Sequence, residues 1–318
     1  MKTNTFKEKY EYIDDDLIKR GAFGDVYKIK DKNVKTEYVL KKLIKENPNN
    51  PNIKGTDKKS FENELNFLIN VKGTNIINII DYGEDDKYFY LVLEKMEEDL
   101  GMMINKYKNG MSSKLIRKIF SQINSGLKIM NDKGKTHRDL KPENILFSYT
   151  NDKKTDFIVK IGDFGLSTDI IGTTIASNAG SELFKAPEVE EGKYSNKCDL
   201  YSIGIILYML KTGEYIFEGK TKFDILKNQT ANKIKKEIDD ENLNKLIKKL
   251  VVIDPHKRME WKEYFDDPFF KVNDEDVKES EECKIKIKIL DKKIINEYYE
   301  NKKCIIFISN ISNNRITK

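Results

Sequence analysis

The chain has 318 residues, a length that allows one large hydrophobic core or two smaller ones. Hydrophobic residues make up 38% of it and charged residues 35%, so the chain can fold although much of its surface is charged. The 58 Lys and Arg side chains nearly balance the 53 Asp and Glu side chains, which excludes a protein held to nucleic acid by uncompensated positive charge.

The location of the protein is predicted from segments that the sequence lacks. The start, MKTNTFKEKYEYIDDD, has no apolar stretch typical of a signal peptide, and no run approaches the roughly 18 apolar residues of a membrane-spanning helix. Cys198, Cys283 and Cys304 are widely spaced, which disfavours a disulfide framework and a zinc site. We therefore expect an intracellular protein without a membrane span, in the cytoplasm or, alternatively, in the nucleus.

The first third of the chain has the pattern of a small β-sheet with one helix. Residues 60–71 show the helical spacing of apolar side chains, with Ser60 as the expected N-cap. Elsewhere in this third, Val, Tyr and Ile alternate with charged residues, which is typical of strands. The expected strands cover residues 25–30, 37–43, 76–82 and 88–93.

After Glu94 the pattern becomes mainly helical. Apolar side chains recur every three or four residues from Ser112 until Gly134, which predicts one long helix. Residues 199–211 are apolar on nearly all sides, which predicts a buried helix. Further expected elements are a helix at 241–252 and short strands at 144–147 and 157–161.

A short stretch between these elements holds polar groups in an order that suits phosphoryl transfer. Asp139 can accept a proton from a hydroxyl group, and Lys141 can meet a γ-phosphate. Asn144 and Asp163, the latter two residues ahead of Gly165, offer oxygen ligands to a hard cation such as Mg²⁺. The sequence therefore predicts a catalytic pair with two metal ligands beside it.

Residues further upstream extend this pattern. Gly21 and Gly24 lie in a turn between strands, where backbone N–H groups can cover phosphates. Lys41 lies on the third strand, and Glu64 on the following helix is its expected counter-ion. Taken singly, these residues also fit ordinary structural roles, as hairpin glycines, a strand lysine and a charge near a helix N-terminus. Their joint order along the chain is what indicates a nucleotide site.

The motifs in this order resemble those of the eukaryotic protein kinase family, over about residues 12–270. The stretch HRDLKPEN at 137–144 is similar to the catalytic loop, and DFG at 163–165 is similar to the magnesium-binding turn. APE at 186–188 is similar to the end of the activation segment. The stretches KPEN and GSELF resemble the Ser/Thr branch of the family more than the tyrosine branch.

The resemblance implies an α+β, bilobal fold. Residues 1–96 would form a small, β-rich N-terminal lobe with one helix, in which the kinase domain starts at about residue 12. Residues 97–270 would form a larger, mainly helical C-terminal lobe. Residues 271–318 would be a linker and a tail, for which an interaction segment and plain disorder both remain open.

The resemblance also implies a nucleotide site between the lobes. Leu93 resembles the gatekeeper residue, residues 94–96 the hinge that meets adenine, and Asp99 the residue near the ribose. Lys19 replaces the first glycine of the phosphate-covering loop, which predicts a weaker or altered nucleotide fit without loss of activity. The expected nucleotide-binding residues are Ile18, Gly21, Gly24, Val26, Val39, Lys41, Glu64, Leu93, Glu94, Met96, Asp99 and Leu146.

Several other residues receive supporting roles from the same resemblance. Asp199 would brace the catalytic loop from below, with its charge hydrogen-bonded. Arg258 would pair with Glu188 through the planar fork of its guanidinium group. The column of apolar side chains that links the lobes would contain Leu68, His137 and Phe164.

Together these implications predict a Ser/Thr protein kinase that uses ATP and Mg²⁺ to phosphorylate protein hydroxyls. Phosphorylation of Thr173, Thr174 or Ser177, by an upstream kinase or by the chain itself, would pair with Arg138 and order the activation segment. The alternative for that segment is a polar loop without a switch. The alternative for the whole chain is a pseudokinase, a scaffold that binds nucleotide or partners without turnover.

Overall fold

The computed structural model describes residues 6, 8–20, 24–46, 55–165, 168–169, 181–190, 195–219, 222–231, 233–235 and 237–271. The chain divides into two units after Phe270, and the described residues belong to the first unit apart from Lys271. Gly21, the predicted phosphorylation sites Thr173, Thr174 and Ser177, and the predicted tail from residue 272 onward therefore lie outside the described residues.

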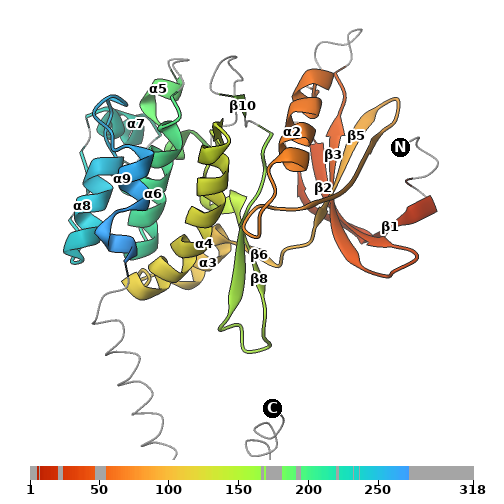
Figure 1. Ribbon diagram of the computed structural model, residues 1–318, viewed down its shortest axis with the longest axis horizontal. Helices are drawn as coiled ribbons and strands as arrows, with labels where there is room; N and C mark the ends of the chain where they lie inside the picture. The colour runs from red at the N-terminus through yellow and green to blue at the C-terminus, as the bar shows by residue number, and fades with distance from the viewer. Residues whose placement is uncertain are drawn as a thin grey trace, which may run out of the picture. The chain divides into compact units, whose positions relative to one another are not determined.

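An antiparallel sheet of five strands, in the order β1-β2-β3-β5-β4, makes up most of the N-terminal part (Figure 1). The alternating patterns at 25–30, 37–43 and 88–93 correctly predicted three of these strands. Helix α2 (Lys58–Asn70) lies on the sheet, where Phe61 of the helix stacks on Phe89 with ring centroids 4.3 Å apart. The strands are β1 (Tyr10–Arg20), β2 (Gly24–Asp31), β3 (Glu37–Ile44), β4 (Ile79–Glu84) and β5 (Tyr88–Glu94).

Apolar side chains cover the sheet on both faces. Successive residues of β5 point to opposite faces, so Leu91 belongs to the main core while Tyr90 and Val92 belong to a smaller cluster. That cluster is completed by Phe6 and Tyr10, and the Phe6 ring stacks on the Tyr90 ring at 4.9 Å. Residues from the start of the chain therefore bury the second face of the sheet.

The predicted starts of helix α2 and strand β4 were wrong. Helix α2 begins before Ser60, and its N-cap is Asp57, whose Oδ1 accepts a hydrogen bond from the Ser60 N–H at 2.9 Å. Aspartate caps a helix as well as serine does, and here it occurs three residues earlier. Residues 76–78 do not belong to β4, because Ile77 donates its N–H to the carbonyl of Ile161, in another strand, at 2.9 Å.

The C-terminal part is built around helix α6 (Cys198–Thr212), which is buried on nearly all sides, as its apolar sequence predicted. Helix α4 (Ser113–Asp132) also matches its prediction, since Ser112 is the N-cap and Gly134 has a φ of 63° just after the helix. The remaining elements are β6 (Glu98–Asp99), α3 (Leu100–Lys106), β7 (Lys135–Thr136), η1 (Pro142–Asn144), β8 (Ile145–Tyr149), β9 (Phe157–Ile161), β10 (Thr168–Asp169), η2 (Ser181–Phe184), α5 (Pro187–Glu190), α7 (Lys222–Thr230), α8 (Glu241–Leu250), α9 (Trp261–Phe265) and η3 (Pro268–Phe270).

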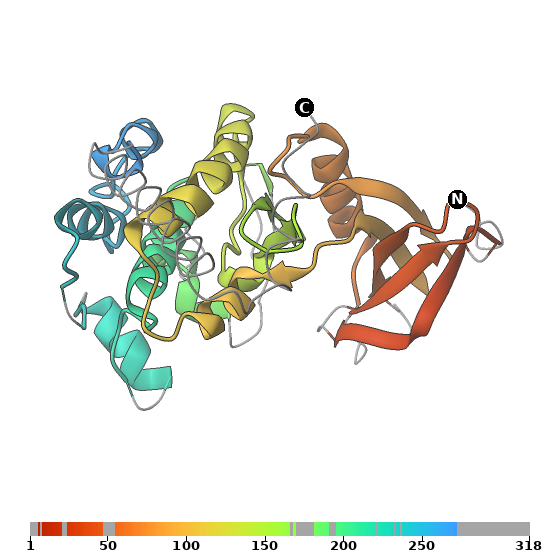
Figure 2. The ribbon, with the colours of Figure 1, turned by 90° about the horizontal axis from the view of Figure 1, so that it is seen from below.

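The fold is therefore α+β, with a β-rich N-terminal lobe and a mainly helical C-terminal lobe (Figures 1 and 2), as predicted. The exact lobe boundary, after residue 96, stays a prediction. One apolar core includes Phe67 of α2, Ile161 of β9 and Ile203 of α6, so it extends through both lobes. Within the described part of the chain, none of the helices combines the length and apolar character that a membrane crossing requires.

Candidate active site

The loop between β7 and β8 gathers three of the predicted site residues. Lys141 Nζ lies 2.5 Å from Asp139 Oδ2. The Asn144 amide donates to the Asp139 carbonyl at 2.7 Å and contacts its Oδ2 at 3.2 Å. These contacts fix the direction of the Asp139 carboxylate, so it is pre-positioned to accept a proton from a group that approaches the loop.

Asp199 of helix α6 holds this loop from below. Its two carboxylate oxygens accept hydrogen bonds from the N–H groups of His137 (2.7 Å) and Arg138 (2.8 Å). Burial raises the pKa of Asp199, and the charges and N–H groups of the loop partly offset this rise. Arg138 has a φ of 68°, a left-handed conformation that bulky residues rarely adopt without outside support. The predicted brace is present.

His137 connects the loop to the turn that carries Asp163. Its Nδ1 accepts the Asp139 N–H at 3.3 Å, so the ring proton is on Nε2, which donates to the Gly162 carbonyl at 2.9 Å. Gly162 in turn donates its N–H to the Asn144 carbonyl at 2.9 Å. The histidine therefore has the structural role predicted for it, and it joins the two loops that hold the predicted metal ligands.

Phe164 packs into the core directly after Asp163. Its ring lies 5.1 Å from the His137 ring and stacks on Phe67 of helix α2 at 4.2 Å. Leu68, the predicted member of this column, is buried in the same core. The sequence analysis missed Phe67, although the ring next to Leu68 on an apolar helix face was a visible signal.

Lys41 of β3 lies between two carboxylates from different elements. Its Nζ is 2.7 Å from Glu64 Oε1 of helix α2 and 2.8 Å from Asp163 Oδ1. Burial by itself would lower the pKa of Lys41, but the two carboxylates more than offset this effect and raise it. The charge of Lys41 in turn lowers the pKa of Asp163, whereas burial raises the pKa of Glu64.

The residues predicted for the adenine pocket lie on strands of two different sheets. Val39 on β3 pairs with Leu93 on β5, and Val26 on β2 pairs with Lys41, two residues further along β3. Leu146 lies on β8 and packs against the main core, as does Met96 after β5. Leu93, Met96 and Leu146 therefore pack against one core, and the adenine pocket stays a prediction.

Other predicted nucleotide residues have additional structural roles. Asp99 caps helix α3, because its Oδ1 accepts the Met102 N–H at 2.8 Å. Gly24 faces β3 so closely that a Cβ atom would lie 2.1 Å from the Lys42 carbonyl oxygen, so only glycine fits there. Ile18 lies on β1 with 48% of its surface exposed.

Glu94 is tied to strand β9 by a partly buried ion pair that the sequence analysis missed. Its Oε1 lies 2.6 Å from Lys160 Nζ and accepts the Asn78 N–H at 2.7 Å. A lysine in the otherwise apolar strand FIVKI was the signal for such a partner, since a buried ammonium group needs one. Glu94, the predicted hinge residue, is thereby connected to the strand that leads to Asp163.

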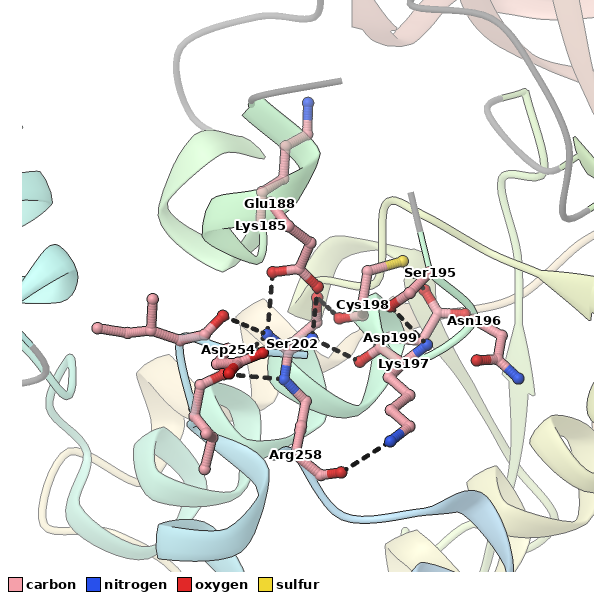
Figure 3. A network of polar contacts seen from close by, with 12 residues as sticks. Lys185, Glu188, Ser195, Asn196, Lys197, Cys198, Asp199, Ser202, Asp254 and Arg258 are labelled. Atoms are coloured by element: carbon pink, nitrogen blue, oxygen red, sulfur yellow. Dashed lines mark hydrogen bonds and ion pairs between the residues drawn. The ribbon is translucent and has the colours of Figure 1, made fainter. Parts of the chain in front are cut away.

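Glu188 and Arg258 form the predicted pair in the helical lobe. The two terminal guanidinium nitrogens contact the two carboxylate oxygens at 2.6 and 2.9 Å, as Figure 3 shows. The guanidinium group also lies 5.0 Å from the centre of the Tyr201 ring. Both side chains are buried, and this bidentate geometry is the strongest form of such a pair.

The oxygen groups available to a metal are few. Among the described residues, no cluster of three or more His, Cys, Asp and Glu side chains is placed to hold an ion. The Asn144 amide nitrogen bonds to Asp139, so its oxygen would meet a cation, together with the Asp163 carboxylate, which is 47% exposed. Two such groups fit Mg²⁺, which keeps waters and phosphate oxygens among its ligands.

Comparison with known proteins identifies the family of the chain. The protein kinase domain matches residues 12–270. The chain belongs to the protein kinase family. Calcium-dependent protein kinase 4 of Plasmodium falciparum is 36% identical over 230 residues, 72% of this chain and 42% of that kinase. Members of this family generally use ATP with Mg²⁺ and act on proteins.

Two further relatives extend the similarity. Calcium-dependent protein kinase 3 of Plasmodium berghei is 30% identical over 280 residues, 83% of this chain and 47% of that protein. The serine/threonine-protein kinase ATG1 of Pichia angusta is 26% identical over 329 residues, 90% of this chain and 40% of that protein. The chain thus spans less than half the length of these relatives.

Proposed function

We propose that this kinase domain transfers the γ-phosphoryl group of ATP to Ser and Thr hydroxyls of protein substrates. The observation that carries the proposal is one continuous set of contacts. It runs from Lys41 through Asp163 and the backbone of Gly162 to Asn144 and Asp139. The Ser/Thr kinases among the relatives support the same substrate class.

Each residue in this set has a distinct proposed task. ATP with Mg²⁺, when bound, supplies the phosphoryl group and neutralises the charge of the phosphates. Asp139 accepts the proton of the substrate hydroxyl, and Lys141, at 2.5 Å, orients Asp139 and offsets charge on the γ-phosphate. Lys41, held by Glu64, binds the other phosphates, and Asn144 with Asp163 holds the metal ion.

The nucleotide site also includes the remaining predicted residues. Their proposed roles are to enclose adenine and ribose from strands β1 to β3, the hinge and β8. None of the observations on the described residues favours the pseudokinase alternative, because Lys41, Asp139 and Asp163 are all present and Lys41 Nζ lies 2.8 Å from Asp163 Oδ1.

The proposal is tested with Asp139→Asn in the full chain. The parent should transfer ³²P from ATP to Ser/Thr peptides of a degenerate library in the presence of Mg²⁺. The variant should lose at least about 100-fold in rate, because the base is gone, yet should still show a thermal shift with MgADP. Asp132→Asn, at the exposed end of α4, is the matched control and should keep parental rates. Equal rates in Asp139→Asn and the parent would refute the proposed base.

Phosphorylation of the activation segment is a second part of the proposal. Arg138 is buried next to Asp139, so a phosphate on Thr173, Thr174 or Ser177 that paired with it would order the segment beside the catalytic loop. Mass spectrometry of the active protein should find phosphate on this segment, and the triple alanine variant should be less active. Full activity of that variant would rule out the switch.

A further inference from the structure

Strand β9, which leads to Asp163, is the last strand of the sheet β6-β8-β9, so β8 pairs with only one of its two edges. In an antiparallel pair, the backbone groups of alternate residues point away from the partner strand. In β9 these outward residues are Phe157, Val159 and Ile161. Their outward groups therefore need hydrogen-bond partners from elsewhere in the chain.

Two amide side chains supply most of these partners. Gln122 of helix α4 accepts the Val159 N–H through Oε1 at 2.9 Å and donates through Nε2 to the Phe157 carbonyl at 3.0 Å. Asn75, in the connection between α2 and β4, donates through Nδ2 to the Val159 carbonyl at 2.8 Å. The same Nδ2 lies 3.2 Å from Gln122 Oε1, so each amide also orients the other. We call Gln122 and Asn75 the amide pair.

The backbone beside Asn75 completes the edge at the end of β9. Ile161 donates its N–H to the Asn75 carbonyl and accepts the Ile77 N–H, each at 2.9 Å. Asp163 follows only two residues later. Strand β9 is therefore bonded at each of its outward residues, up to the turn that carries this carboxylate.

Close packing of helix α4 brings the amide pair together. Gly126, about one turn after Gln122, faces the connection so closely that a Cβ atom would lie 2.8 Å from the Asn75 carbonyl oxygen. Asn75 is only 8% exposed, so a lost bond would leave a polar group with a desolvation cost. The bonds between the amide pair and β9 therefore restrain the backbone of the strand.

We propose that Gln122 and Asn75 are positioning residues for the magnesium ion that accompanies ATP. They take the place of a neighbouring strand on the free edge of β9 and so hold the turn that carries Asp163. A ligand that is held in place before binding loses less entropy when the ion binds. This inference rests on the proposed function, in which Asp163 holds the metal ion.

Gln122→Met in the full chain tests the inference through ADP binding. Methionine has nearly the size of glutamine but lacks the amide that bonds to β9. Calorimetry gives the dissociation constant of ADP in Mg²⁺ and in EDTA, and the ratio of the two measures the contribution of the ion. This ratio should shrink roughly three- to tenfold in the variant, while ADP in EDTA binds as in the parent. The Val159 amide should also exchange with deuterium faster, because Gln122 is its acceptor.

A second variant and a matched control complete the test. Asn75→Leu removes the bond to the Val159 carbonyl but keeps the backbone bond to Ile161, so the same ratio should shrink less than in Gln122→Met. Asn124→Leu is the control, because Asn124 is also an amide of helix α4 but accepts the Tyr264 hydroxyl at 2.6 Å. In this control the ratio should stay at the parental value.

The inference is wrong if both variants of the amide pair keep the parental ratio, even when they unfold at a lower temperature. It is also wrong if they weaken ADP binding equally in Mg²⁺ and in EDTA, since that result indicates only general loosening. These measurements need no turnover, so the proposed phosphoryl transfer stands in either case. A parent that phosphorylates no library peptide, with variants that shift the ratio as expected, would refute the transfer and support the inference.

Discussion

Lys41 illustrates how one side chain determines the charge balance of the site. Its ammonium group lies within 2.8 Å of a carboxylate on α2 and of another on the turn after β9. The pKa of Lys41 is raised, so its favourable contribution is present below its usual value of 10.5 and is lost only as the pH rises through a still higher value. The pKa of Asp163 is lowered, so its contribution is lost only in acid, below its usual value of 3.8.

Lys41→Met removes the positive charge that lies between the two carboxylates. Without the lysine, the pKa of Glu64, already raised by burial above 4.5, rises further, so the folded variant binds a proton more readily than the unfolded chain. The free energy of unfolding should fall by about 2–4 kcal/mol at pH 8, because two carboxylates lose their shared partner, and by less at pH 5.

Urea unfolding at the two pH values measures this difference. Lys95→Met is the control, because Lys95 forms an exposed pair with Glu37 at 2.5 Å, and exposed pairs contribute at most about 1 kcal/mol. If Lys41→Met lowers the free energy of unfolding by the same amount at both pH values, the expected rise in the pKa of Glu64 is contradicted.

Helix α6 is the element on which the site depends most. Its sequence is apolar nearly all round, and two of its polar residues, Asp199 and Ser202, bind the backbone of the catalytic loop and the carbonyl of Phe184. Gly204 lets the helix approach α8: an added Cβ would lie 2.6 Å from Val251 Cγ2 and 2.9 Å from Leu250 Cβ. Close packing therefore sets the position of α6, and this position determines where Asp199 and Ser202 hold their partners.

Gly204→Ala should destabilise the protein although alanine favours helix formation. The gain in helix propensity is about 1 kcal/mol, whereas overpacking against α8 costs about 1–3 kcal/mol and shifts α6. Unfolding in urea, followed by Trp261 fluorescence, measures the change. Ser125→Ala, on the exposed face of α4, should stay within about 0.5 kcal/mol of the parent. A Gly204→Ala variant more stable than the parent would show that the protein accommodates the added Cβ beside α8 without a loss of stability.

At the scale of the whole molecule, the two lobes share hydrogen bonds and a core. Asn75, in the connection between α2 and β4, donates through Nδ2 to the Val159 carbonyl at 2.8 Å, and its own carbonyl accepts the Ile161 N–H at 2.9 Å. The same core extends from Phe89 of the sheet to Leu246 of helix α8. Local unfolding of one lobe would therefore expose apolar surface of the other.

We expect the described unit to unfold in one cooperative transition. Trp261, the one tryptophan of the sequence, is buried in the helical lobe and donates to the Asn196 carbonyl at 2.9 Å, so its fluorescence reports on that lobe. Urea midpoints from this fluorescence and from hydrogen exchange of strands β3 and β5 should coincide. Two separate midpoints would mean that the lobes unfold independently.

Local sequence patterns predicted much of this fold, and the motifs predicted much of the site. Helix α6 was recognisable from its apolar composition, and Lys41 with Glu64 from the joint order of the motifs. Long-range contacts outside the family motifs left no comparable signal. Gln229 meets a carbonyl 44 residues away in the sequence, and nothing in its own helix indicates that partner. Asp57 and Ser60 are both good N-caps, so only the backbone geometry separates them.

The aromatic cover on the outer face of the sheet has a practical consequence. Similarity to the family begins at residue 12, which invites the preparation of a fragment that starts there. Such a fragment would lack Phe6 and Tyr10 and would leave Tyr90 and Val92 facing water on a sheet that needs both faces buried. It should associate or precipitate where the longer chain stays dispersed, so recombinant material is best made with the first residues retained.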